Sequence, residues 1–298
     1  EDDAMSAVNL HEVNQYPDAA FPVALYCGSH HGIVPNGRGL MDYHWHEELQ
    51  ITMITSGNAV LQVGAAHYTL SAGEALYIGS GLVHAVTELS QDGTYASLNF
   101  PAKLLGFFPG SRMEQQDVLP FTSGVAMPVI CFRPGTPWHD EILSYLHQII
   151  ALFGSGNTTV HCYHISVWLA EIWLLIRQHQ DATALSVSPV QLSRLQTMLH
   201  YLYAHYTDAL ALQQLAASAN ISTGECCRTF RRCLGISPHR FLKEYRIRRA
   251  MELLSGGASV TDAAQQCGYQ QDSNFIAAFR SITGTTPLQY AKSLRETD

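Results

Sequence analysis

The sequence is poor in charged residues and has no long uninterrupted apolar run. Of its 298 residues, 14% are charged and 47% are hydrophobic, a balance that excludes a disordered chain and gives enough apolar material for two folded domains. The longest nearly apolar stretch, residues 165–176, contains Glu171 and is shorter than the roughly 20 residues that cross a bilayer. We therefore expect no membrane partner. The first residues are acidic where a signal peptide is basic, which predicts a cytoplasmic location.

Cysteine pairs and the common catalytic motifs are also missing. There are seven cysteines, an odd number, and no CxxC pair, which favours reduced thiols over a disulfide framework or a zinc ribbon. The chain has no GxSxG elbow and no GxxxxGK phosphate loop. Its nearest approach to HExxH begins at His46 and fails at Gln50. Serine hydrolase, nucleotide hydrolase and zincin activities therefore lack sequence support.

Charge is divided unevenly along the chain. Residues 1–180 contain 5 Lys and Arg against 16 Asp and Glu, and they hold 12 of the 15 histidines. Residues 181–298 contain 12 Lys and Arg against 9 Asp and Glu. The second part can therefore bind a polyanion, and any imidazole chemistry belongs to the first. Small and polar residues at 181–190 predict a linker between the two parts.

The second part contains an internal repeat. One pattern occurs at residues 230–241 and again 49 residues later at 279–290. It consists of a Phe-Arg pair, then a glycine, then Ser or Thr directly before a proline, and finally an aromatic residue. Upstream of each copy, a small residue is followed four positions later by a residue that tolerates positive φ. The two pairs are Ala216 with Asn220, and Ala264 with Gly268. A helix-turn-helix needs both features, a close helix crossing and a tight turn. We therefore predict two helix-turn-helix units.

The helix after each turn is expected to expose one face. Residues 222–225 read Ser-Thr-Gly-Glu, which predicts a capping box. In the first unit Cys226 and Phe230 are expected to be buried, and in the second unit Phe275 and Phe279. The outward residues, which we predict to contact DNA, are Ser222, Thr223, Gly224, Cys227, Arg228 and Arg231 in the first unit, and Gln271, Asp272, Ser273, Ile276, Ala277 and Arg280 in the second.

A long helix is expected to join the two units. It opens at Ser237 and Pro238 and closes at Gly256 and Gly257, a length of roughly 25 Å, so the units can reach major-groove segments about one DNA turn apart. It also carries a set of basic residues that we expect to face phosphates. These are Lys243, Arg246, Arg248 and Arg249.

Residues 192–295 resemble the DNA-binding domain of the AraC/XylS family of bacterial transcription regulators. The most specific part of the resemblance runs from Ala263 through Cys267, Gly268 and Tyr269 to the Thr286-Pro287 pair. It implies two helix-turn-helix units joined by a long helix and a double-stranded DNA operator as partner. The alternative, an ordinary helical bundle with a solvated basic face, does not account for two copies in register. Arg228 is the best candidate for a bidentate contact to guanine, while Ala277 stands where the family often has a long polar residue. The second unit is therefore expected to contribute more to anchoring than to base reading.

The first part predicts a small β barrel. From residue 21 to residue 100, short β-prone runs alternate with Gly, Asn and Ser turns. Histidines at 44 and 46, a glutamine at 50 and a histidine at 84, spaced among glycines that include Gly39, resemble the two cupin motifs. The resemblance implies that His44, His46, Gln50 and His84 face the barrel interior and bind a ligand.

The nature of that ligand stays open at this point. Metal-dependent cupins use three His and a Glu, but this chain has Gln50 at the carboxylate position. We therefore assign no metal and no cofactor, and favour a small-molecule effector. A barrel without any ligand, its histidines being hydrogen-bonded core residues, is the remaining interpretation.

Two helices are expected after the barrel. Residues 139–153 form an amphipathic helix, and residues 158–180 are apolar nearly all round, so a second chain is expected to cover the second helix and give a homodimer. The sequence thus predicts an α+β multidomain protein. Its parts are a cupin-like sensing barrel at 1–135, a helical dimerisation layer at 136–180, a linker at 181–190 and an all-α domain with the two helix-turn-helix units at 191–298.

The expected function is that of a non-enzymatic, sequence-specific transcription regulator that responds to a small-molecule effector, with RNA polymerase as a candidate partner. The alternative is a metal-dependent cupin oxygenase or isomerase with a helical C-terminal domain.

Overall fold

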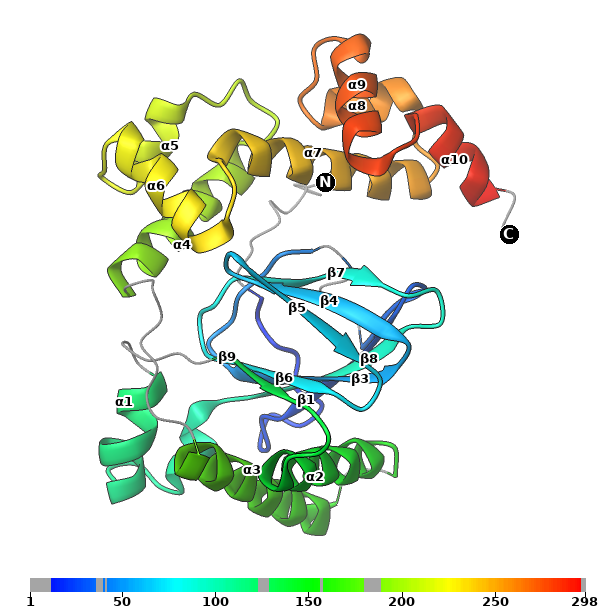
Figure 1. Ribbon diagram of the computed structural model, residues 1–298. Helices are drawn as coiled ribbons and strands as arrows, with labels where there is room; N and C mark the ends of the chain where they lie inside the picture. The colour runs from blue at the N-terminus through cyan, green and yellow to red at the C-terminus, as the bar shows by residue number, and fades with distance from the viewer. Residues whose placement is uncertain are drawn as a thin grey trace. The chain divides into compact units, whose positions relative to one another are not determined.

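The computed structural model describes residues 12–35, 40, 42–122, 129–155, 158–179 and 189–295. The chain divides into two compact units, one ending at Leu192 and the other beginning at Ser193, and each is described by itself (Figure 1). Residues 181–188, most of the predicted linker, and Gly39 of the cupin pattern lie outside the described residues.

The N-terminal unit is built on two antiparallel sheets. The six-stranded sheet has the order β2-β1-β8-β3-β6-β9, and the three-stranded sheet has the order β5-β4-β7. The strands are β1 (Ala24–Ser29), β2 (Gly32–Val34), β3 (Leu49–Ser56), β4 (Asn58–Val63), β5 (Ala66–Ser71), β6 (Ala75–Ile78), β7 (His84–Leu89), β8 (Thr94–Phe100) and β9 (Val129–Phe132). Tight turns connect β3 to β4, β4 to β5 and β5 to β6, with Gly57, Gly64 and Gly73 all at positive φ, as the spacing of glycines in the sequence predicts.

Strand β3 is buried on both faces, which decides where the two cores lie. Ile51 and Met53 belong to a cluster shared with the helices, whereas Ile54 belongs to a cluster between the two sheets. Because side chains alternate along a strand, Gln50 and Thr52 then face the space between the sheets, and both are buried. The barrel interior is therefore partly polar.

Helices cover the outer face of the six-stranded sheet. After the short segments η1 (Ala102–Gly106), η2 (Glu114–Val118) and α1 (Leu119–Thr122), the chain forms β9 and then α2 (Pro137–Phe153) and α3 (Thr159–His179), which lie together beneath the sheet in Figure 1. The buried face of α3, which includes Leu169 and Trp173, packs in the same cluster as Ile51.

Helix α3 corrects one expectation from the sequence. At 21 residues it is long and apolar enough to cross a membrane by length and composition alone. The sequence had suggested otherwise, because the nearly apolar stretch at residues 165–176 is shorter than a membrane span. Core helices of globular domains pass the same test. The predicted helix, residues 158–180, agrees with α3 to within one residue at each end.

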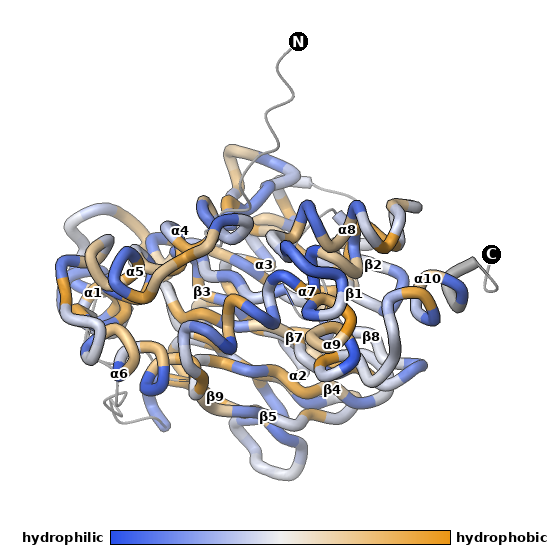
Figure 2. The backbone as a smooth tube through the Cα atoms, turned by 90° about the horizontal axis from the view of Figure 1, so that it is seen from above, coloured by the Kyte–Doolittle hydropathy of each residue, from blue (hydrophilic) through white to orange (hydrophobic). Residues whose placement is uncertain are grey.

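The C-terminal unit is helical. It begins within α4 (Pro189–Ala204), of which the part from Ser193 onward belongs to this unit. The helices that follow are α5 (Leu212–Ser218), α6 (Thr223–Leu234), α7 (Pro238–Ser255), α8 (Val260–Gln266), α9 (Asp272–Thr283) and α10 (Pro287–Arg295). Blue and orange segments alternate along α9 in Figure 2, as in an amphipathic helix.

The two predicted turns are confirmed. Asn220 has φ 53° between α5 and α6, and Gly268 has φ 77° between α8 and α9. Ser222 and Ser237 cap α6 and α7 by accepting from the third amide of each helix. Helix α7 has 18 residues, about 27 Å, and connects the two helix-turn-helix units as expected.

Candidate nucleic-acid interface and histidine pocket

Helix α6 has one buried and one open face. Cys226 and Phe230 are fully buried, as predicted. Of the predicted contact residues on this helix and its cap, four are exposed and two are half-buried. The exposed ones are Ser222, Gly224, Arg228 and Arg231, and the half-buried ones are Thr223 and Cys227.

Arg228 is held by a neighbouring carboxylate on the open face of α6. Its Nε and Nη2 atoms lie 2.9 and 2.7 Å from Oε2 of Glu225. The predicted capping box is therefore only half right, because Ser222 accepts from the Glu225 amide while the Glu225 side chain pairs with Arg228. The Arg228 side chain remains 70% exposed, and a carboxylate that accepts from one edge of a guanidinium orients its remaining donors.

Helix α9 presents the corresponding face of the second unit. Phe275 and Phe279 are buried, as predicted. All six residues that were expected to point outward from this helix are exposed: Gln271, Asp272, Ser273, Ile276, Ala277 and Arg280.

One of the four basic residues of α7 corrects another expectation. Arg246 does not face solvent as a phosphate contact would; its Nε and Nη2 donate to the backbone carbonyls of Tyr206 and Asp208 at 2.6 and 2.7 Å. Its guanidinium also lies 5.6 Å from the ring centroid of Tyr269, a cation–π distance. Arg246 therefore links the segment between α4 and α5 to the turn of the second unit.

In the N-terminal unit, backbone pairing brings the predicted histidines together. His44 and His84 form an isolated antiparallel bridge, with N–H···O distances of 3.0 and 2.9 Å in the two directions. The ring centroids of His44 and His46 lie 4.3 and 5.2 Å from that of His84. All three rings are buried, and each offers one ligand nitrogen within 4.8 Å of the others.

Gln50 completes this cluster. Its Oε1 lies 2.9 Å from Nε2 of His46 and 3.0 Å from Nε2 of His84, and its Nε2 donates to Thr52 at 2.8 Å. Burial lowers the pKa of His46 and, helped by the neighbouring His46, lowers that of His84 to about 3. Both rings are therefore neutral near pH 7.

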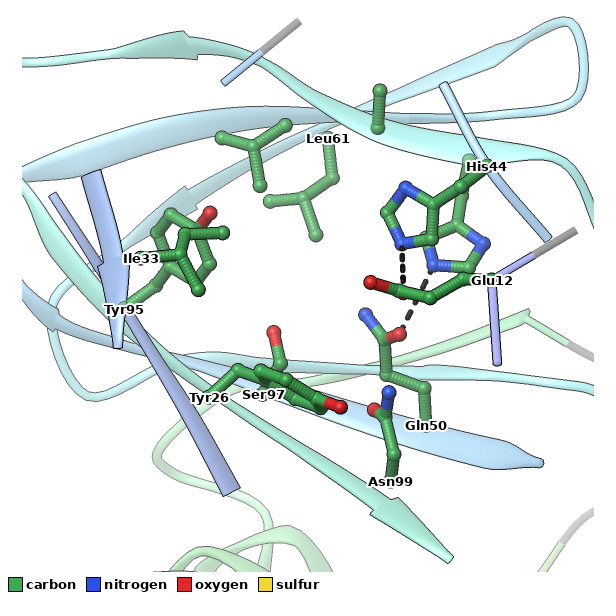
Figure 3. A pocket seen from close by; sticks show the side chains of 12 residues that line it. Glu12, Tyr26, Ile33, His44, Gln50, Leu61, Tyr95, Ser97 and Asn99 are labelled. Carbon is green, nitrogen blue, oxygen red and sulfur yellow. Dashed lines mark hydrogen bonds and ion pairs between the residues drawn. The ribbon is translucent and has the colours of Figure 1, made fainter. Parts of the chain in front are cut away.

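The pocket beside this cluster is small and has two kinds of wall. It has a volume of about 30 Å³. Figure 3 shows His44, Gln50 and Glu12 at one end, with Ile33 and Tyr95 at the other. Glu12 comes from the segment before β1, and its Oε2 lies 3.3 Å from Nε2 of His44.

The chain resembles known proteins in both units. Residues 215–293 match a helix-turn-helix domain family, and residues 30–95 match a cupin domain family. YdeC, an HTH-type transcriptional regulator of Bacillus subtilis, is 29% identical over 288 residues, which cover 95% of this chain and 96% of YdeC. The chain is an AraC-type transcription regulator with a cupin domain.

Two further proteins are similar to this regulator over most of its length. The melibiose operon regulatory protein of Escherichia coli is 20% identical over 256 residues, covering 84% of this chain and 83% of that protein. The structure of ToxT from Vibrio cholerae aligns with 91% of this chain and 97% of its own, at 12% identity and a TM-score of 0.44. The helix-turn-helix match and the likeness to YdeC make DNA binding and transcription regulation the general activities of the regulator.

Three contacts of the regulator were not expected from its sequence. Glu12 contacts His44 from a distant segment, and Glu225 pairs with Arg228 instead of the expected backbone amide. Arg246 connects the two helix-turn-helix units by bonding to the segment before the first of them. Glu225 had a detectable signal, since an acid three positions before an arginine on a helix lies beside it. Glu12 had none, because it lies in an irregular segment.

Proposed function

We propose that the chain is a sequence-specific, effector-responsive regulator that inserts α6 and α9 into successive major-groove segments of an operator. One observation carries this proposal: each helix follows a turn with a positive-φ residue, buries its aromatic or cysteine face and leaves its polar face open, at the two ends of a helix about 27 Å long. A recognition helix presents such a face to base edges.

Base reading is assigned unequally to the two helices. Arg228 on α6 is oriented by Glu225, which suits a bidentate contact to O6 and N7 of guanine. The open face of α9 has Asp272, Ile276 and Ala277 beside the single arginine Arg280, so we assign to α9 mainly anchoring and shape recognition.

The histidine pocket is the proposed effector site. His44, His46, Gln50 and His84 are buried polar groups that point to one place, and a few convergent polar groups in a pocket are typical of a ligand site. Effector binding is proposed to change the affinity of the regulator for its operator through a population shift.

A homodimer is the proposed working form, located in the cytoplasm and with RNA polymerase as a further partner. Helix α3 supports it, because four apolar residues form a stripe on the face opposite its buried one. These are Val160, Tyr163, Val167 and Leu174, which are 49% to 72% exposed. A second copy placed about a two-fold axis would bury the stripe against itself.

The test of this function is selection of a DNA sequence from a random duplex library by the purified chain of 298 residues. We expect a recovered site with two conserved blocks about one helical turn apart in each half-site, bound at least a thousandfold tighter than unrelated DNA. Recovery of no preferred sequence, with binding that depends only on salt, would contradict sequence-specific regulation.

A further inference from the structure

Asn99 on β8 has a buried acceptor atom that no donor of the chain satisfies. The residue is 2% exposed and lines the barrel pocket, beside Gln50 in Figure 3. Within the part of the chain that the structure describes, no hydrogen-bond partner reaches its Oδ1 atom. A buried acceptor that stays unsatisfied destabilises the fold, so a donor supplied by a ligand would be stabilised at this atom.

A chain of hydrogen bonds that starts at a carboxylate fixes the orientation of the Asn99 amide. An ionised carboxylate only accepts, so the Asn14 group that lies 2.7 Å from Oε2 of Glu48 is its NH₂ group. The Asn14 oxygen then lies 2.7 Å from Asn99, which presents its own NH₂ group there. Rotating the Asn99 amide by 180° would bring two oxygens together. Its Oδ1 therefore remains the acceptor without a donor.

Glu12 and His44 add two acceptors to the same pocket. Among the described residues that line it, Glu12 is the one carboxylate, and there is no Lys or Arg. Its Oε2 lies 3.3 Å from Nε2 of His44. Because Nδ1 of His44 donates to the carbonyl of Asp42 at 2.8 Å, Nε2 of the neutral ring carries a lone pair. One nitrogen with several N–H bonds can donate to both atoms.

The charge of the barrel favours a cation. Residues 12–100 contain eight Asp and Glu against a single basic residue, Arg38. Burial, with the Glu12 carboxylate adding to it, raises the pKa of Tyr95 to about 12, and burial and the same carboxylate also raise the pKa of Tyr26. Both phenols line the pocket. Surroundings that oppose a new negative charge in this way attract a positive one.

The size of the pocket limits the ligand to a few atoms. Its volume is about 30 Å³, and each water-sized group needs about 10 to 15 Å³, so the space holds about two or three such groups. Ile33 and Tyr95 lie at the end away from Glu12 and His44 (Figure 3). Apolar and aromatic side chains of this kind suit CH₂ groups next to a positive charge. A sugar ring is too large for this space.

We propose that the pocket binds a primary ammonium group on a short alkyl chain, with Glu12, His44 and Asn99 as its acceptors. The carbon atoms of the ligand lie against Ile33 and Tyr95. The pocket rejects carboxylates because of their charge, and it rejects quaternary ammonium ions because they have no N–H donor. That this ligand is the effector rests on the proposed function, whereas its binding does not.

Two arrangements without an ammonium ligand compete with this proposal. A proton on His44 would pair with Glu12, but it would leave Oδ1 of Asn99 without a donor. A water molecule would satisfy Asn99, but it would bring no positive charge to Glu12. Both arrangements predict that the pocket takes up no ammonium ion in a saturable manner.

The experiment is an NMR titration of the chain of 298 residues, labelled with ¹³C at the methyl groups of Ile and Leu. The probes are ethylammonium, ethanol and acetate, which have similar sizes and different charges, at constant ionic strength and with chelator present to keep metal ions out. We expect saturable shifts of the Ile33 and Leu61 methyl signals with ethylammonium, at about millimolar affinity because the probe is so small. Ethanol should bind at least tenfold more weakly, and acetate should not bind. No saturable shift with ethylammonium, or equal affinities for ethylammonium and ethanol, would overturn the proposal.

Two variants test the acceptors. Glu12→Gln should weaken ethylammonium binding at least tenfold, whereas the matched control Glu88→Gln, at an exposed carboxylate on β7, should leave it unchanged. Asn99→Leu removes the unsatisfied acceptor and nearly keeps the volume. It should lower the ratio of the affinities for ethylammonium and ethanol at least tenfold, a ratio that general loosening of the pocket would not change. Equal ethylammonium affinities of Glu12→Gln and Glu88→Gln would overturn the proposal.

Operator binding is measured on the same preparations to keep the two proposals apart. A chain that binds its operator but takes up no ethylammonium refutes only the ammonium site. A chain that binds ethylammonium but has no preferred DNA sequence refutes only the proposed function.

Discussion

Gly268 lies against the backbone of Thr207 with no room for a side chain. A Cβ atom on Gly268 would be 2.4 Å from the Thr207 carbonyl oxygen and 2.8 Å from its carbonyl carbon. Gly268 forms the turn of the second helix-turn-helix, and Thr207 precedes the first. Arg246 bonds to both neighbours of Thr207 and lies over the Tyr269 ring. Together these contacts join the two helix-turn-helix units directly, so α7 is not the sole connection between them.

Replacement of Gly268 by Ala should separate the cost of this contact from the cost of backbone strain. Gly257 is the matched control, since it has a similar positive φ of 88° and a Cβ atom added to it would meet no other atom within 4 Å. Gly257→Ala should lose about 1 to 2 kcal/mol from left-handed strain, and Gly268→Ala about 1 to 3 kcal/mol more from the steric clash. Urea unfolding measures both, and equal losses would show that the contact with Thr207 is unimportant.

Arg246→Met should loosen the joint without touching the recognition faces. The change removes two hydrogen bonds from a charged group to carbonyls, each worth about 1.5 to 3 kcal/mol, while the aliphatic stem is kept. We expect weaker binding to a two-segment operator and an unchanged base preference. Arg240→Met, an exposed arginine on the same helix, is the control; if it weakens binding as much, general charge loss explains the effect.

Arg228→Ala should relax discrimination at one base position by about 1 to 3 kcal/mol. Its control is Arg232→Ala, which removes the same charge from an exposed position on the same helix outside the predicted reading face. Affinities for a set of operators with single base changes distinguish the two. A uniform loss on every operator in Arg228→Ala would mark this residue as a phosphate contact.

Much of this fold could be predicted from the sequence, because it depends on the chemistry of neighbouring residues. Asn220 and Gly268 were identifiable because few residues accept positive φ, and the paired motifs follow from a repeat of 49 positions. The barrel strands follow from glycine turns and alternating patterns. The histidine set was found from its resemblance to cupins, since the bridge between His44 and His84 joins residues 40 positions apart.

Contacts that depend on tertiary packing could not be predicted from the sequence. Arg246 appeared in sequence as one more basic residue on a long helix, and only the folded chain places the carbonyls of Tyr206 and Asp208 beside it. Glu12 lies in a segment with no periodic pattern, so nothing in the sequence places it near His44. The exposed stripe of α3 could be expected only as excess apolarity, without a defined face.

Val167→Lys should weaken self-association if the α3 stripe is a dimer interface. Val167 lies in the middle of the stripe and is 56% exposed, so a lysine there is tolerated in the monomer but desolvated in the dimer. Sedimentation velocity should show a shift to monomer. Gln148→Lys, at an exposed position of α2, adds the same charge to the neighbouring helix and should leave the oligomeric state unchanged; a shift in both variants would indicate simple charge repulsion.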